Sequence, residues 1–134
     1  MLKLWHLLSS LFLAGIAIAL VSCGTNNKLQ SISVTPATAN AKDYAVGRVQ
    51  FTAAGTYTNG SQVKPLTVLW SPGPPAVVQP AMVVVDNNGV ASCGSVPPGT
   101  YPVWAGAPAD PHIAVSSMNQ STPTVSGEAQ LTCP

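Results

Sequence analysis

The feature that most limits how this chain can fold is the alternation of apolar and polar side chains, one residue at a time, in short runs. In residues 49–57 every second side chain is apolar or small. Neighbouring side chains on a β-strand point to opposite faces, so this period of two predicts a strand with one buried face. After residue 23 the sequence shows no 3.6-residue helical period, and its abundant Val, Thr, Gly and Pro are typical of strands and turns.

Further runs of this kind follow along the chain, separated by turn signals such as Asn59-Gly60 and Pro98-Gly99. About seven strands, each with one apolar face, predict an all-β fold: an antiparallel sandwich of two sheets whose inner faces lie about 10 Å apart. The expected strands are residues 31–35, 49–57, 66–70, 82–85, 90–93, 100–107 and 127–133, with a short edge strand at 77–78. The expected core consists of Phe51, Val68, Trp70, Tyr101, Val103 and Leu131.

Charge is scarce and balanced after the first residues of the chain. Lys3 is the only Lys or Arg before residue 23, which leaves four basic and four acidic residues in the remainder. A nucleic-acid partner requires a basic patch that neutralises phosphates, so this balance argues against nucleic-acid binding. Residues 23–134 are enough for one domain with a core and too few for two.

The first residues have the layout of an export signal. Lys3 precedes an apolar run from Leu7 to Val21, which would be about 22 Å long as a helix. A bilayer core is about 30 Å thick and no basic cluster follows the run, so a secretory signal fits better than a spanning anchor. An uncleaved N-terminal anchor and a signal peptide without lipidation are the alternatives.

The run Leu20-Val21-Ser22-Cys23-Gly24 at the end of this segment resembles the lipobox of bacterial lipoprotein signals. The resemblance implies cleavage before Cys23 and acyl chains on that cysteine, which would hold the protein stably on a membrane of the cell envelope. Gly24, in place of an aspartate, favours the outer membrane or cell surface over the inner membrane. Residues 1–22 would then be a helical signal peptide, 23–29 a lipidated tether and 30–134 the folded domain.

Six pieces of residues 29–133 carry a further resemblance: Leu29–Ala37, Val49–Ser61, Val68–Ser71, Asn88–Ala91, Pro98–Thr100 and Ser126–Thr132. Together they resemble a bacterial Ig-like (group 2) domain. In order, they match that family's opening strand, second strand, tryptophan strand, two later turns and closing strand. The resemblance implies an Ig-like sandwich with a binding or spacing role, and it supplies no shared catalytic residue.

Three features depart from that family's pattern. Residues 108–125 form a long segment where the family has a short link before the last strand. Pro102 lies inside an expected central strand, where it cannot donate a ladder hydrogen bond. Cys93 and Cys133 have no counterpart among the family's characteristic residues. The long segment joins two adjacent strands and is expected to project from the end opposite the two cysteines.

The two cysteines are expected to form a disulfide. In the sandwich arrangement the strands that end at Cys93 and Cys133 run in the same direction, so both residues reach the same end of the domain. An exported protein also folds in an oxidising compartment. The bridge would close a loop of about 40 residues and contribute roughly 4 kcal/mol. Two free thiols, packed as small apolar groups, are the alternative.

No cluster of residues in the sequence indicates catalysis. His112 has no triad partners, and the acidic residues are few and scattered. His112, Met118 and the two cysteines match no compact metal-ligand spacing, and a disulfide would use both thiols. Residues 86–89 resemble the start of a calcium loop but lack the later oxygen ligands and the closing glutamate, so we expect an ordinary turn. We therefore expect no enzyme activity, no metal and no cofactor.

Trp104 falls on the face of its strand that points away from the core, close to the 108–125 segment. An outward tryptophan can contact a protein or a sugar, and His112, Ile113 and Met118 of the segment could share that contact. The alternative is that the segment folds over Trp104. The expected function is a non-enzymatic, membrane-anchored envelope lipoprotein whose domain binds or adheres to a protein or glycan. A structural spacer without a specific ligand is the second hypothesis.

Overall fold

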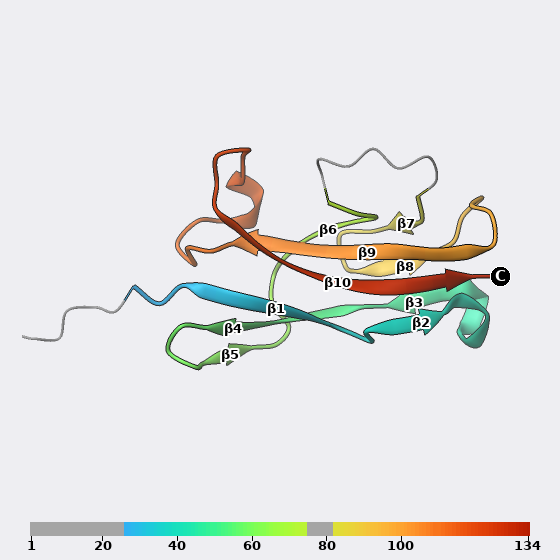
Figure 1. The fold of residues 1–134 in the computed structure, drawn as a ribbon, viewed down its shortest axis with the longest axis horizontal. Helices are drawn as coiled ribbons and strands as arrows, with labels where there is room; N and C mark the ends of the chain where they lie inside the picture. Colours follow the sequence, from blue (N-terminus) through green and yellow to red (C-terminus); the bar gives the residue numbers. More distant parts are fainter. Residues whose placement is uncertain (1–25, 75–81) are drawn as a thin grey trace, which may run out of the picture.

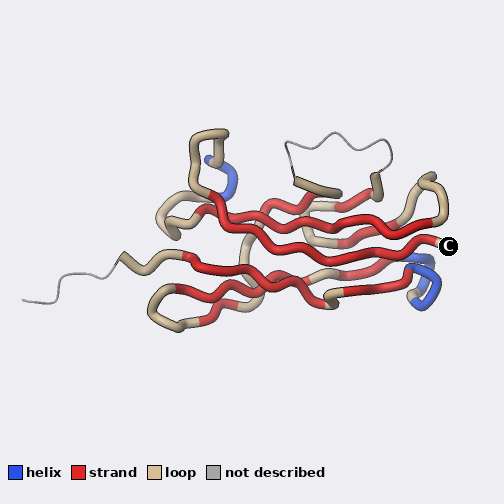
Figure 2. The backbone as a smooth tube through the Cα atoms, in the orientation of Figure 1, coloured by secondary structure: helices blue, strands red, loops and turns tan. Residues whose placement is uncertain are grey.

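The computed structural model describes residues 26–74 and 82–134. The expected helical signal peptide, Cys23 and the edge strand at 77–78 lie outside the described residues. Within them the protein is all-β, as predicted, and the helical elements are short 3₁₀ turns near the two ends of the domain (Figure 2). These turns are η1 (Ala41–Asp43), η2 (Ala45–Gly47) and η3 (Val115–Ser117).

The strands of the described residues pair into three sheets (Figure 1). The first sheet has the order β1 (Leu29–Thr35), β4 (Thr52–Tyr57), β5 (Gln62–Val63). The second has the order β2 (Thr38–Asn40), β10 (Thr124–Cys133), β9 (Gly99–Pro108), β6 (Leu69–Ser71). The third has the order β3 (Arg48–Gln50), β8 (Val90–Ser92), β7 (Val84–Val85).

Strands β3 and β4 are two halves of one stretch, separated only by Phe51. The backbone N–H of Phe51 donates to the carbonyl of Gly89, 2.9 Å away, at the point where the stretch changes its partner from β8 to β1. The strand predicted over 49–57 is therefore present but divided between two sheets. The first and third sheets therefore share one continuous stretch of chain and meet at Phe51, where a sandwich of two sheets was predicted.

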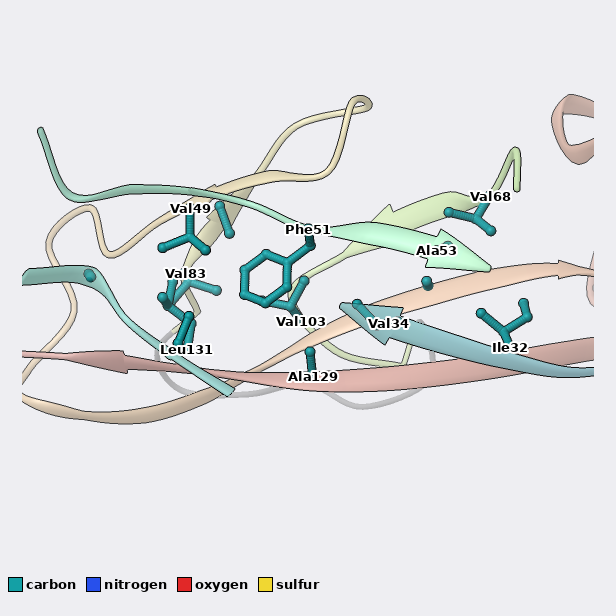
Figure 3. Packing of buried hydrophobic residues seen from close by; sticks show 14 of the residues in the cluster. Ile32, Val34, Val49, Phe51, Ala53, Val68, Val83, Val103, Ala129 and Leu131 are labelled. Carbon is teal, nitrogen blue, oxygen red and sulfur yellow. The ribbon is translucent and has the colours of Figure 1, made fainter. Parts of the chain in front are cut away.

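Phe51 lies within the hydrophobic core, with its ring beside Val103 of β9 (Figure 3). Of the expected core residues, Phe51, Val68, Val103 and Leu131 are buried, as predicted. For the other two, Trp70 and Tyr101, the predicted burial in the core was wrong, because they are only partly buried.

Trp70 and Tyr101 pack against the core cluster but are only partly buried. Trp70 belongs to β6, a three-residue strand at the edge of its sheet. The hydroxyl of Tyr101 donates to the carbonyl oxygen of Pro97 at the surface, 2.8 Å away. An edge position and a polar tip therefore keep these two aromatic side chains partly in contact with solvent.

The pairing of β9 with β10 extends along the whole domain. It is antiparallel from Gly99 opposite Cys133 to Pro108 opposite Thr124. The predicted Cys93–Cys133 disulfide is present at one end of this pair, with the two Cα atoms 5.7 Å apart. The 109–123 loop, which joins the two strands, lies at the other end, also as predicted (Figure 1).

Parts of the sheet pattern differ from the predicted antiparallel sandwich. β2 runs parallel to β10, and a three-residue strand is too short for alternation to reveal. The strand expected over 66–70 begins only at Leu69, because the preceding residues cross from the β5 side of the domain to β6. In that crossing the N–H of Leu66 donates to the carbonyl of Ala53, 2.8 Å away.

Pro102 is tolerated inside β9 because β6 pairs only with residues 104–106 of that strand. On the β6 side, no strand of the described residues lies opposite Pro102, so the missing N–H breaks no ladder hydrogen bond there.

Gly127 allows β10 to pass close to β1. A Cβ atom at this position would lie 2.5 Å from the backbone oxygen of Ile32, too close for any other residue without a shift of one strand. This approach fixes the position of the first strand against the β9–β10 pair.

Candidate interaction surface

An open apolar groove of about 690 Å³ lies on one side of the domain, at the end where β1 begins. Leu29, the first residue of β1, and Pro108, the last residue of β9, both line it. The rest of the lining comes from the ends of β4, β5 and β9, the β5–β6 connection, β6, the turn before β8 and the 109–123 loop. Its main apolar side chains are Val63, Leu66, Leu69, Trp70, Ile113 and Val115.

Three side chains of this groove are both apolar and substantially exposed. Val63 is 42% exposed, Leu69 41% and Ile113 37%. Val63 and Leu69 belong to edge strands, so the sheets leave their outer sides without a neighbour in the described residues. Exposed apolar side chains that gather around one depression indicate a contact surface, whereas singly scattered ones do not.

The 109–123 loop is held in shape by its own hydrogen bonds. The carboxylate of Asp110 accepts from the backbone N–H of His112 at 2.9 Å, and its carbonyl accepts from the N–H of Ile113 at 3.1 Å. At the base of the loop, the N–H of Ala109 donates to the carbonyl of Pro123 at 2.8 Å. These bonds form a local turn that places Ile113 at the groove.

Of the four residues predicted for a binding surface, Ile113 alone lines the groove. His112, its neighbour in the chain, is exposed, and Met118 is partly buried; neither is among the residues that line the groove. The loop therefore contributes to the surface mainly through Ile113 and Val115.

Trp104 is not among the residues that line the groove, although Gly106, against which its ring packs, is the register partner of the groove residue Leu69. Its side chain points away from the core, since Val103 and Ala105 on either side of it face inward, yet it is only 7% exposed. The ring packs against Gly106 on the same face of β9. In this position Trp104 offers little ring surface to a partner.

Sequence reasoning did not identify Val63 or Leu69 as surface contacts. For Leu69 a signal exists: it alternates with Val68 and Trp70 and so places an apolar side chain on the outward face of its strand. Val63 carries no such signal, because β5 has only two residues.

A second pair of exposed apolar residues lies at the opposite end of the domain. Tyr44 is 40% exposed and Val46 90%. Both are close to Cys93 of the disulfide and to Pro134. Val46 has a φ of 50°, a left-handed conformation that is rare for a β-branched residue.

No protein-family model matches this chain, and no curated protein matches it.

In residues 26–74 and 82–134 no helix is long and apolar enough to cross a bilayer. The same part of the chain holds no group of three or more His, Cys, Asp or Glu side chains that could bind a metal ion. Fold and surface together define an all-β domain that is closed by a disulfide and carries an apolar groove at the end where the chain enters.

Proposed function

We propose that this chain is an exported protein that is anchored in the bacterial cell envelope by acyl chains on Cys23. The Leu20–Cys23 motif after an apolar segment is the main support. The Cys93–Cys133 disulfide agrees with export, since disulfides persist in oxidising compartments such as the periplasm and are rare in the cytosol. On this proposal residues 1–22 are removed, and the mature protein sits on the outer membrane or the cell surface.

The strand order supports an Ig-like sandwich as the finer description of the fold. In a constant-type Ig domain, strands A, B, E and D form one sheet, and strands C, F and G form the other. Here β1, the β3–β4 stretch, β8 and β7 follow the first order, and β6, β9 and β10 follow the second. The pieces that resemble a bacterial group 2 Ig-like domain fall on these strands and turns. We therefore propose that residues 30–134 are a domain of this kind.

The function that the surface supports best is binding without catalysis. The observation that carries it is the apolar groove, in which three exposed apolar side chains lie on β-strands and on a hydrogen-bonded loop. Loops on a rigid scaffold are common sites of binding. The proposed partner is a component of the cell envelope that presents an apolar surface to Leu69 and Ile113.

A structural spacer is the second candidate function. The burial of Trp104 favours it, because the aromatic side chain best suited to a partner is used in packing. The internal hydrogen bonds of the 109–123 loop also favour it, because the chain's own groups hold the loop in shape.

Photo-crosslinking in the cell envelope distinguishes binding from spacing. A photoreactive phenylalanine analogue replaces Ile113 in the full chain, and Val84 serves as the control, because it is 60% exposed on β7 and does not line the groove. We expect specific adducts from position 113 that are absent from position 84. If folded, membrane-associated protein gives no specific adduct at position 113, the spacer function is favoured.

A further inference from the structure

The chain enters the domain at a fixed point. The N–H of Lys28 donates to the hydroxyl of Thr58 at 3.1 Å, and the N–H of Thr58 donates to the carbonyl of Lys28 at 2.9 Å. The side-chain oxygen of Asn27 also accepts from the N–H of Asn59 at 3.4 Å. Residues 27 and 28 are thus attached to the turn that follows β4.

Covalent geometry limits how far Cys23 can lie from this turn. Four residue steps separate Cys23 from Asn27, and a fully extended chain spans at most about 3.3–3.6 Å per residue, or about 14 Å in all. The limit holds for any conformation of the intervening residues. If Cys23 carries acyl chains in a bilayer, the turn after β4 lies within about 14 Å of that lipid.

The apolar groove is at the same end of the domain. Leu29 lines it, and the N–H of Leu29 donates to the carbonyl of Ala109 at the base of the 109–123 loop, 2.8 Å away. Figure 1 shows the start of β1 and this loop at one end, with the C-terminus at the other. The anchor therefore holds the groove toward the bilayer and the disulfide end away from it.

From these observations we infer that the groove is a lipid-contact surface, and that Leu69 and Ile113 rest in the head-group region of the bilayer that holds Cys23. The inference rests on the proposed anchor. The head-group layer is about 5–8 Å thick on each side of the hydrocarbon core, which the reach of the tether covers. The anchor also makes the contact between the groove and the bilayer intramolecular, so a small apolar surface is enough to keep the groove at the interface.

A protein or glycan partner is a less suitable occupant of the groove. It would have to enter the narrow space between the domain and the bilayer that a tether of about 14 Å permits. Lys28 on the tether is exposed and suits the negative head-groups of an anionic membrane. The apolar residues at the far end, Tyr44 and Val46, remain free for contacts away from the membrane.

Depth measurements on the full-length precursor, processed in a bacterium and purified from its membranes, test the inference. Ile113→Cys and Tyr44→Cys provide matched sites, since the native side chains are 37% and 40% exposed at opposite ends of the domain. Leu69→Cys is a second groove site in case Ile113→Cys folds poorly. The Cys93–Cys133 disulfide does not react with thiol labels, so each variant takes an environment-sensitive fluorophore at its introduced cysteine. Intact mass first reports whether Cys23 is acylated and therefore unlabelled.

The labelled proteins are reconstituted into vesicles of phosphatidylcholine and phosphatidylglycerol. We expect the fluorophore at 113 to be blue-shifted and quenched severalfold more strongly by spin-labelled lipid than the fluorophore at 44, with the reverse order for aqueous iodide. Equal lipid quenching at both positions in acylated protein would overturn the inference. Protection of position 113 from both quenchers would also overturn it, because protein would then fill the groove. An unacylated Cys23 would remove the anchor itself, and the mass spectrum reports that outcome separately.

Discussion

Replacing Phe51 with alanine is expected to lower the free energy of unfolding by about 3–5 kcal/mol, the range for a fully buried large aromatic side chain. Phe51 is 1% exposed and sits where the β3–β4 stretch passes from one sheet to the next. Its removal would leave a cavity that borders Val103 of β9 (Figure 3). Urea denaturation followed by circular dichroism measures the change.

Two further variants serve as controls for Phe51→Ala. Leu69→Ala should change the free energy of unfolding by no more than about 0.5 kcal/mol, because its side chain is 41% exposed. Trp70→Ala should cost less than Phe51→Ala, because Trp70 is only partly buried. An unchanged urea midpoint for Phe51→Ala would mean that the two sides of the domain do not pack on this residue.

Removing the Cys93–Cys133 disulfide is expected to cost about 4 kcal/mol, since the bridge closes a loop with a sequence separation of 40. The double variant Cys93→Ala, Cys133→Ala avoids both a free thiol and a buried hydroxyl group at position 133, where the side chain is 3% exposed. Denaturation of the variant and of reduced wild type should give the same midpoint, well below that of the oxidised protein.

Alkylation of natively exported protein provides the independent check. Without a reductant, neither Cys93 nor Cys133 should take up the reagent, because the bridge leaves no thiol. Two readily alkylated thiols in that sample would show that the cysteines pack as free side chains, and the expected loss of stability would not apply.

Alternation predicted the strands well where they are long and face a core on one side. The β9–β10 pair, the position of the 109–123 loop and the common end of the two cysteines all follow from it. It also predicted the direction of Trp104 correctly. It could not predict how much of that ring is covered, since coverage depends on packing such as that against Gly106.

Other features had no local signal. The parallel pairing of β2 and the pairing of β5 involve three and two residues, too few for a period to show. Trp70 lies on the predicted face, but its exposure depends on the edge position of β6, which only the sheet order defines. The groove brings Ile113 together with Val63 and Leu69 from a distant part of the sequence, so no single stretch of sequence could indicate it.

The lipid anchor at Cys23 is the central claim, because both the envelope location and the orientation of the groove depend on it. The most direct test is the intact mass of the protein, extracted with detergent from the membranes of a bacterium that expresses the full chain. We predict a mature N-terminus at Cys23 with added acyl mass, and loss of that acyl mass for Cys23→Ser. A membrane-bound protein that retains Met1–Ser22, or a mature Cys23 without acyl mass, would contradict the anchor.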